Sequence, residues 1–224
     1  MDYGQTFATW RDAATKPWHD FTHHAFVEGM RDGSLPKSAF MHYLIQDYVF
    51  LVHFSRAWSL AVVKAETIDK MKVCAGTVDA LVNHEMALHV KTCAEAGIDE
   101  ATLFNAAEDL ENLAYTRFVM DAGLQGDFLD MMAALAPCVM GYGDIGSRLA
   151  LSKAADTPYL DWIETYAGAD YQGVCTTVGK MIDTAIVRRV GDLSSSPRAA
   201  SLQARFTKAT ELEIGFWDMG MRGA

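Results

Sequence analysis

The sequence predicts an all-α protein folded as a single helical bundle. Its five prolines and 17 glycines separate long stretches in which apolar residues recur with the period of an α-helix. No stretch alternates apolar and polar residues between turn pairs, as a half-buried strand would. The 224 residues contain no repeat, low-complexity tract or linker, so we expect one domain over residues 1–224.

Turn and stop residues divide the chain into its expected helices. The turn before the second helix carries Ser34 and Pro36, which favour a helix start. Gly97 and Gly123 favour helix ends, and residues 98–111 fit no single type of structure. The first expected helix covers about residues 6–29, and the second runs from the Ser34–Pro36 turn to about residue 64. The others cover about residues 68–96, 112–122, 127–151, 159–167, 169–190 and 198–221.

Charge, cysteine content and hydropathy exclude several classes of protein. Nineteen Lys and Arg against 29 Asp and Glu give a net charge of −10 with no basic block, which argues against nucleic-acid binding. The four cysteines have neither CxxC nor paired-ligand spacing, so we interpret them as reduced thiols. The N-terminus lacks signal-peptide features, and no apolar run approaches the ~20 residues of a membrane span. We therefore expect a cytoplasmic protein that does not bind a membrane.

Asp47 lies in the middle of an aromatic helix face. At about 100° per residue, large apolar side chains fall within about 60° of it on the helix: Phe40, Tyr43, Leu44, Phe50, Leu51, Phe54 and Trp58. Polar residues fall on the opposite half: His42, Gln46, His53 and Arg56. An ionised carboxylate among aromatic side chains costs several kcal/mol unless it is paired, hydrogen-bonded or protonated. Asp47 is therefore either a structural acceptor between helices or an acceptor that faces a ligand.

Glu213 occupies a similar position in the last helix. Its neighbours on the helix face are apolar: Leu202, Phe206, Ala209, Phe216 and Trp217. Glu211, in contrast, lies on the polar side. We expect these surroundings to raise the pKa of Glu213, which suits a general acid and base near neutral pH. The alternative is that Glu213 is a buried structural glutamate bonded to a tyrosine or a backbone group. A third acid, Glu85 in the expected helix 68–96, is interpreted as structural.

Cys138 follows Pro137, a residue that we expect to interrupt and kink helix 127–151. It shares a face with Met131, Leu135, Tyr142, Ile145 and Leu149. A free cysteine in such a place is commonly an inert core residue, but a distorted helix with Tyr142 one turn on is typical of a functional site. A thiol in apolar surroundings stays protonated, so a nucleophilic Cys138 needs a base, for which Glu213 is the candidate.

The histidines do not predict a metal site. His84 and His89 are five residues apart and diverge by about 140° on a helix, so they cannot chelate zinc as an HExxH pair does. His19 and His23 are one turn apart, and an exposed polar face explains them more simply than a metal. The sequence contains no Glu-x-x-His pair for a di-iron centre and no glycine-rich phosphate loop. We expect neither a metal nor a cofactor.

Several ordered segments resemble the TenA/thiaminase II family over most of the chain. The strongest are the Gln-Asp-Tyr segment at Asp47, the Pro-Cys segment followed by Tyr142, and the Glu-x-x-Phe-Trp-Asp-Met segment at Glu213. The matching pieces, in order, are Trp18, residues 24–36, 43–51, 114–116 and 133–138, Gly141-Tyr142, Ile145-Gly146, Trp162-Ile163, Tyr166, Glu213 and residues 216–219.

The resemblance implies an all-helical fold like that of haem oxygenase, without haem, and usually a homotetramer. It also implies hydrolysis of an aminopyrimidine at its exocyclic methylene carbon, in thiamin salvage. The substrate would be 4-amino-5-aminomethyl-2-methylpyrimidine, which releases ammonia, or thiamin, which is split into a hydroxymethylpyrimidine and a thiazole. No metal or cofactor takes part.

By the same resemblance, Cys138 would be the nucleophile that adds to the pyrimidine ring. Glu213 would protonate the leaving amine and activate water, and Asp47 would hydrogen-bond the aminopyrimidine edge. A thiolate that adds to the ring divides one difficult displacement into two easier steps. The carboxyl group that gives a proton to the leaving group can then take one from water.

The resemblance also assigns four aromatic residues to substrate binding. Phe50 and Tyr142 would stack on the ring or flank it, and Tyr115 and Tyr166 would line the pocket and form hydrogen bonds. Aromatic walls favour a flat neutral heterocycle, while a buried carboxylate opposite its N–H donors orients it.

Two other functions remain open at the level of sequence. The same pocket could hold a pyrimidine without turning it over, as a binding or regulatory module. A helical oxygenase that carries haem or di-iron is the second alternative. The sequence also leaves open the choice between thiamin and its breakdown products, because that choice depends on the depth of the pocket.

Overall fold

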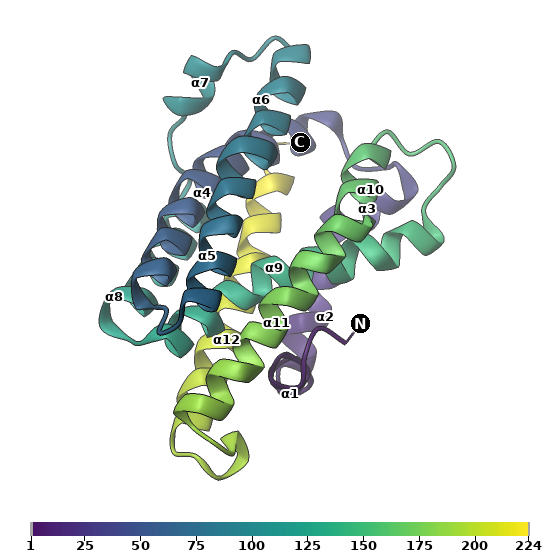
Figure 1. The fold of residues 1–224 in the computed structure, drawn as a ribbon. Helices are drawn as coiled ribbons and strands as arrows, with labels where there is room; N and C mark the ends of the chain where they lie inside the picture. The colour runs from purple at the N-terminus through teal and green to yellow at the C-terminus, as the bar shows by residue number, and fades with distance from the viewer. Residues whose placement is uncertain (1, 224) are drawn as a thin grey trace.

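The structure is a computed structural model that describes residues 2–223, apart from the side chains of His84 and Leu88. Within these residues it contains helices and no strand, which confirms the predicted all-α class (Figure 1). The α-helices are α1 (Gln5–Ala13), α2 (Thr15–Thr22), α3 (Ala25–Asp32), α4 (Lys37–Lys64), α5 (Ile68–Ala80), α6 (Met86–Glu95), α7 (Glu100–Phe104), α8 (Leu110–Gln125), α9 (Phe128–Ser152), α10 (Leu160–Ala167), α11 (Ala169–Arg189) and α12 (Arg198–Met221).

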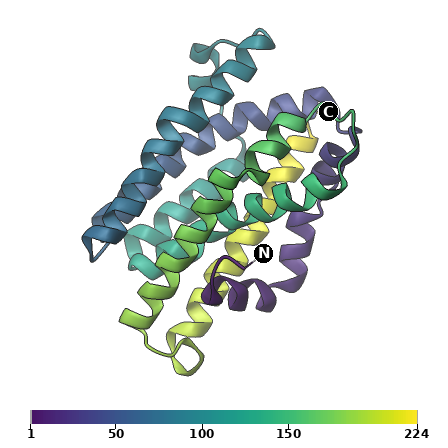
Figure 2. The same cartoon turned by 45° about the vertical axis from the view of Figure 1, so that its right-hand side comes forward.

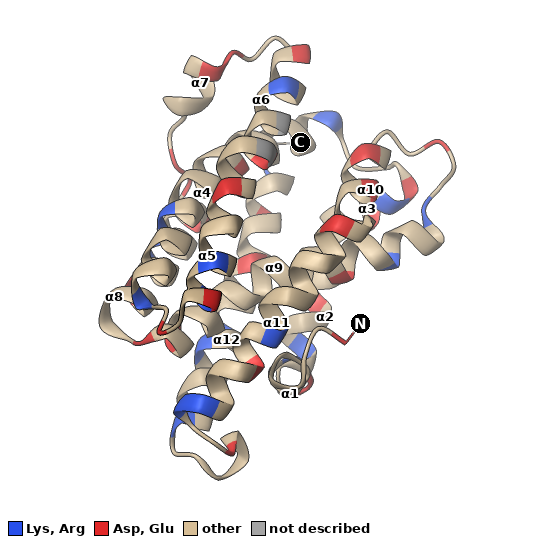
Figure 3. Ribbon diagram, in the orientation of Figure 1, with Lys and Arg blue, Asp and Glu red and all other residues tan. Residues whose placement is uncertain are grey.

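Helix α9 lies at the centre of the bundle. It packs against α2, α8, α10, α11 and α12, while α4 and α5 lie side by side on one flank (Figures 1 and 2). By length and composition α9 could cross a membrane, although the sequence suggested no such run. Because 89% of its most apolar window is buried in the molecule, α9 has the character of a core helix. Figure 3 shows charged residues of both signs scattered over the helices.

The single helix expected over residues 6–29 is wrong, because α1, α2 and α3 replace it. Pro17 lies in the first turn of α2, where a missing backbone N–H costs no helical hydrogen bond. His24 has an extended backbone, and its Nδ1 accepts a 3.2 Å hydrogen bond from the backbone N–H of Phe26. His24 therefore caps α3, a role that apolar periodicity does not reveal.

The helix expected over residues 68–96 is interrupted by a π-turn, Leu81–Glu85, between α5 and α6. The backbone N–H of Met86 donates to the carbonyl of Leu81, five residues earlier. A π-turn adds one residue to the helical cycle and shifts the faces of the two helices relative to one another, and such turns are frequent at functional sites. Residues 98–111, which fitted no single structure, contain the short helix α7.

The expected helix at 127–151 is present as α9, but it continues through Pro137 without the predicted interruption. Asp127 begins the helix with a capping box, in which its side chain and that of Asp130 each accept a hydrogen bond from the other residue's backbone N–H. Packing on nearly every side compensates for the hydrogen bond that Pro137 removes, a loss of about 3 kcal/mol in an isolated helix.

Gln46 does not belong to the polar outer half of α4, as its position on the helix suggested, because it is buried. Its side-chain amide donates to the carbonyl of Ala107 at 2.8 Å and accepts a 3.0 Å hydrogen bond from the backbone N–H of Asp109. The segment before α8 thus covers this part of α4. The aromatic face of α4 was predicted correctly: Tyr43, Phe50, Phe54 and Trp58 are buried.

Candidate active site

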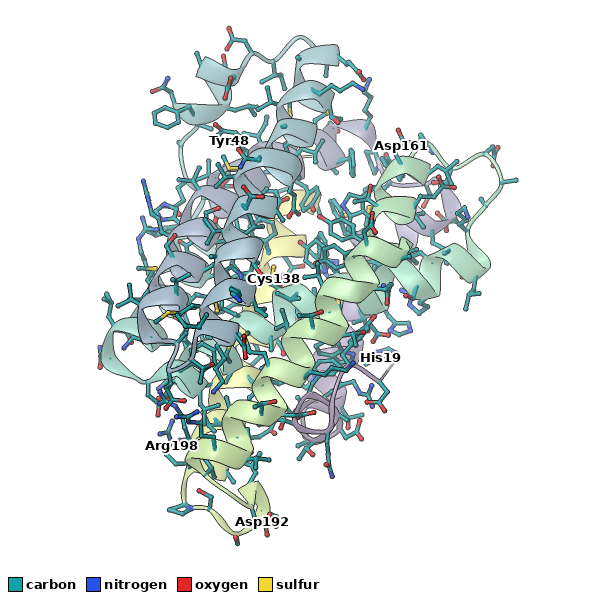
Figure 4. The ribbon with its side chains drawn as sticks, in the orientation of Figure 1. His19, Tyr48, Cys138, Asp161, Asp192 and Arg198 are labelled. Atoms are coloured by element: carbon teal, nitrogen blue, oxygen red, sulfur yellow. The ribbon has the colours of Figure 1, made fainter. Side chains whose placement is uncertain are left out.

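A cavity of about 410 Å³ lies between α4, α5, α9, α10 and α11. This volume falls in the range of roughly 300–1,000 Å³ that is typical of small-molecule sites. The floor is formed by buried side chains: Asp47, Phe50, Tyr142 and Tyr166, with the partly exposed Cys138 among them. Figure 4 shows Cys138 near the middle of the molecule, between the ribbons of α5 and α11.

The mouth of the cavity lies between α5 and α11. Figure 1 shows the course of these two helices. The cavity wall there contains exposed residues: Gly76 on α5, and Asp170, Gly173 and Thr177 on α11. A Cβ atom added at Gly76 or Gly173 would meet no other atom within 4 Å. The mouth is therefore kept wide by the absence of side chains at these two positions.

Five of the seven predicted site residues line this cavity: Asp47, Phe50, Cys138, Tyr142 and Tyr166. The other two, Tyr115 and Glu213, lie behind the wall and are buried. The Tyr115 hydroxyl donates a 2.8 Å hydrogen bond to Oε1 of Glu213. The Cys138 side chain lies close enough to the same carboxyl group to affect its pKa. Cys138 therefore lies next to both the cavity and the Glu213 carboxyl group.

The surroundings of Glu213 raise its pKa to about 8. Burial is the main cause, because it penalises the charged form, and the nearby charge of Asp47 adds to it. The hydrogen bond from Tyr115 and the nearby Cys138 thiol oppose this rise, since both favour the carboxylate. Glu213 is thus a group that can exchange a proton near neutral pH, as the sequence led us to expect.

Cys138 rests as a thiol. Burial raises its pKa well above the usual value, and the neighbouring acidic groups, Glu213 first, raise it further. A thiol in such a place becomes a nucleophile only when a base takes its proton during the reaction. Glu213, which lies next to Cys138, is the group placed to take that proton.

Asp47 is paired with His89, a partner that the sequence analysis did not find. Nε2 of His89 lies 2.6 Å from Oδ2 of Asp47, and the Tyr43 hydroxyl donates to the same oxygen at 3.4 Å. Burial lowers the pKa of His89, but the hydrogen bond and charge of Asp47 outweigh that effect and raise the pKa to about 9. The Asp47 carboxylate is therefore stabilised by an imidazolium ion beneath the cavity floor.

Glu85 lines the cavity, whereas its sequence position suggested only a structural role. It is the last residue of the π-turn, and its Oε1 accepts a 2.9 Å hydrogen bond from the Tyr166 hydroxyl. Burial raises the pKa of Glu85, with the charge of Asp47 acting in the same direction. The sequence had already placed Glu85 among apolar residues, and the structure adds its position in the cavity wall and its bond to Tyr166.

Aromatic rings pack closely around the cavity. The ring of Tyr142 lies edge-on to that of Tyr166 with centroids 5.0 Å apart, and Phe50 lies 5.1 Å from Tyr115. A Cβ atom on Gly146 would lie only 2.6 Å from the backbone of Tyr166. A glycine is required there for α10 to approach α9 and to place Tyr166 beside Tyr142.

Residues 11–223 match the model of the TENA/THI-4/PQQC family. The chain belongs to this family. A protein of Haemophilus influenzae whose function is uncharacterised is 35% identical over 91% of this chain and 93% of its own length. The aminopyrimidine aminohydrolase of Halalkalibacterium halodurans is 32% identical over 90% of this chain and 89% of its own length.

Solved structures of TenA proteins have the same fold. The crystal structure of a TenA family transcription regulator from a Silicibacter species superposes with a TM-score of 0.95, at 56% identity, over 98% of this chain and 97% of its own. A domain of Shewanella denitrificans with a haem-oxygenase-like fold superposes with a TM-score of 0.71 at 12% identity, over 96% of this chain and 91% of its own. The expected haem-oxygenase-like fold is therefore confirmed.

In the sequence of this TenA family member, His89 was considered only as half of a poor zinc pair, and Glu85 only as a structural residue. The two residues are one turn apart, so they share one side of the helix. From there His89 contacts Asp47 on α4, and Glu85 contacts Tyr166 on α10. Within the described side chains, no group of three His, Cys, Asp or Glu residues is placed to hold a metal ion.

Proposed function

We propose that this protein hydrolyses an aminopyrimidine at its exocyclic methylene carbon. The substrate would be 4-amino-5-aminomethyl-2-methylpyrimidine or thiamin, and the product 4-amino-5-hydroxymethyl-2-methylpyrimidine. The observation that carries the proposal is that Cys138 and Asp47 line one cavity, with Glu213 and its hydrogen-bonded partner Tyr115 behind the wall next to Cys138. The likeness to an aminopyrimidine aminohydrolase supports the same reaction.

The floor of the cavity suits a flat ring with a hydrogen-bond donor on one edge. Phe50 and Tyr142 offer apolar ring surfaces for stacking. The Asp47 carboxylate accepts the hydrogen bond of the 4-amino group, and Tyr166 closes the wall beside Glu85. Among the described residues, no Lys or Arg lines the cavity, so it favours neutral or cationic ligands over phosphorylated ones.

In the first step, the sulfur of Cys138 adds to a carbon of the ring and forms a C–S bond. The thiol proton passes to the Glu213 carboxylate, and the electron pair of the ring double bond moves onto a ring nitrogen. The closeness of Cys138 to Glu213 supports this transfer. The addition removes the aromaticity that otherwise prevents displacement at the methylene carbon.

In the second step, with the aminomethylpyrimidine as substrate, the bond from the methylene carbon to the departing nitrogen breaks, as Glu213 returns its proton to that nitrogen. Water then adds to the exposed methylene carbon and gives a proton to the Glu213 carboxylate. The C–S bond breaks, the ring becomes aromatic again, and Cys138 recovers a proton from Glu213. The sum is one water consumed and one amine released, with both residues restored.

A non-catalytic pyrimidine-binding module is the second candidate. One observation favours it: the structure that is 56% identical to this chain is named a transcription regulator. The acidic net charge of −10 argues against direct binding to nucleic acid, so such a module would act through a bound small molecule.

An ammonia-release assay run beside equilibrium dialysis separates the two candidates. Each would use purified protein with 4-amino-5-aminomethyl-2-methylpyrimidine, and a parallel assay would use thiamin. Release of ammonia or of the pyrimidine alcohol that depends on Cys138 supports the hydrolase. Binding without product between about pH 6 and 9 would support the binding module instead.

The protein would act as a cytoplasmic homotetramer, as its family resemblance implies. Large apolar side chains that a monomer exposes support self-association: Val63, Ile68, Phe104, Leu110, Leu124, Leu151 and Val187 are each at least 65% exposed. Light scattering after size exclusion tests this proposal, because a tetramer has four times the mass of the 24.6 kDa chain.

A further inference from the structure

His89 on α6 contacts the carboxylate that we assign to substrate recognition, yet it is not among the residues that line the cavity. Its side chain is buried, with 6% of its area exposed, and that of Asp47 is equally buried at 5%. The 2.6 Å contact between them joins residues 42 positions apart in the chain. The pair therefore ties α6 to α4 directly beneath the floor.

The hydrogen bonds of His89 determine where its protons lie. Nδ1 of His89 lies 3.0 Å from the backbone carbonyl of Glu85, which can only accept, so Nδ1 carries a proton. Nε2 and Oδ2 of Asp47 then share the second proton. The titratable groups that face His89 are Asp47 from α4 and Glu85 from the π-turn, both acidic, and both raise its pKa. The pair is consequently an imidazolium with a carboxylate.

This pairing leaves one oxygen of Asp47 for a ligand. Both hydrogen bonds that Asp47 accepts within the described part of the chain, from His89 and from Tyr43, fall on Oδ2. The Tyr43 hydroxyl is itself an acceptor for Nε1–H of Trp162 at 3.3 Å, which holds its proton towards Asp47. Oδ1 is therefore the atom that can accept a hydrogen bond from the cavity.

We propose that His89 is a positioning residue: it fixes Asp47 as an acceptor-only carboxylate with Oδ1 turned to the cavity, and so makes the site selective for rings that carry an amino group. The inference rests on the proposed function for the identity of the ring. It assigns the selectivity to the His89–Asp47 pair and not to the shape of the aromatic walls. A neutral Asp47, in contrast, could also donate a proton and would discriminate poorly between donor and acceptor edges.

The π-turn contributes to this arrangement. The carbonyl that holds Nδ1 belongs to Glu85, the last residue of the turn, and the Glu85 side chain holds Tyr166 in the cavity wall. One distorted turn thus orients two residues of the floor, Asp47 through His89 and Tyr166 through Glu85.

Calorimetric binding of two pyrimidines tests the inference. The first probe is 4-amino-5-hydroxymethyl-2-methylpyrimidine, and the second has a methyl group in place of the 4-amino group. His89→Leu removes the donor to Asp47, and we expect it to weaken binding of the amino probe by about 10- to 100-fold, the usual worth of a hydrogen bond to a charged group. Binding of the methyl probe should change by less than about threefold.

Three further variants separate positioning from a merely structural role. His89→Gln keeps an N–H that can reach Asp47, so it should recover most of the affinity for the amino probe. In an Asp47→Asn background, His89→Leu should have little further effect, because the carboxylate through which it acts is gone. His42→Leu is the matched control, since it breaks a 2.9 Å contact to Asp109 away from the cavity and should leave both affinities unchanged.

The results that would overturn the inference are specific. If His89→Leu weakens binding of the two probes equally, or weakens it as much in the Asp47→Asn background as in the wild type, His89 only supports the fold. A wild-type protein that binds the two probes equally would overturn the selectivity itself. If the wild type binds the amino probe selectively but releases no ammonia from the substrate, the proposed hydrolysis fails while the inference about His89 stands.

Discussion

The Tyr115 hydroxyl donates a 2.8 Å hydrogen bond to Glu213, which lies 98 positions later in the chain. Tyr115 comes from α8 and Glu213 from α12, and both side chains are almost completely buried. Because the hydrogen bond favours the carboxylate, it works against the burial that raises the pKa of Glu213 to about 8. The contact therefore tunes the group that we propose as acid and base.

Tyr115→Phe should move the pH dependence of the reaction upwards. Without the hydroxyl, the pKa of Glu213 rises further above its value of about 8, so a higher pH is needed to ionise the base that receives the Cys138 proton. The ascending limb of kcat/KM against pH should shift to higher pH, with a loss of activity at pH 7 of about tenfold. Tyr159→Phe, which removes a hydroxyl bonded to the carbonyl of Leu35 outside the cavity, serves as control. A profile that does not move would separate Tyr115 from the chemistry.

Cys138→Ser should abolish most turnover without unfolding the protein. A serine hydroxyl fills nearly the same volume but is a far weaker nucleophile towards the ring, so kcat should fall by at least about a hundredfold. Thermal unfolding should stay within a few degrees of wild type. Cys175→Ser, a buried thiol that donates to the carbonyl of Val139, is the matched control and should retain activity. Full activity in Cys138→Ser would reject the nucleophile.

The stability advantage of Glu213→Gln over the wild-type protein should grow as the pH rises. In the native protein Glu213 keeps its proton up to about pH 8, whereas in the unfolded chain it loses the proton near its ordinary value of about 4.3. The native state therefore binds more protons across this window, and wild-type stability falls as the pH rises through it. Glutamine does not titrate. The Tm of the variant minus that of wild type should grow between about pH 5 and pH 8, and a constant difference would contradict the raised pKa.

Gly173→Leu should narrow the mouth of the cavity. A leucine there meets open space beside α5, so it can extend across the opening without disturbing either helix. We expect kcat/KM for thiamin to fall by at least about tenfold, and the value for the smaller aminomethylpyrimidine to fall much less. Gly173→Ala adds only a methyl group and should leave kcat/KM for both substrates nearly unchanged. Equal losses for both substrates would show that ligands do not enter between α5 and α11.

The periodicity of apolar residues was sufficient for most of the fold. It predicted α4, α8, α9, α10, α11 and α12 to within a few residues, because each of these helices buries many apolar residues between clear start and stop signals. It failed at residues 6–29, where His24 caps a new helix through its side chain, and at the π-turn Leu81–Glu85, where the period itself changes. The pattern of apolar residues reveals neither a side-chain cap nor a local change of helical period.

The residues of the candidate site also differ in how far the sequence revealed them. Asp47 and Glu213 could be found in the sequence because a carboxylate in an aromatic face is costly, and Cys138 because it follows Pro137. Five of the seven predicted residues meet in one cavity, while Tyr115 and Glu213 lie behind it. Their roles in catalysis and binding stay predictions. His89 was missed, and Glu85 was interpreted only as structural, because their importance lies in their partners, Asp47 and Tyr166, on other helices.

The sequence by itself determined the helical class and the inward-facing acids, because both follow from the order of apolar and polar residues along one helix. Only the tertiary structure decided which groups share a proton. Whether Asp47 meets His89, or Glu213 meets Tyr115 and Cys138, depends on how separate helices cross, and local periodicity carries no information about that crossing. The pKa values on which the proposed chemistry depends arise from the burial and contacts that this packing creates.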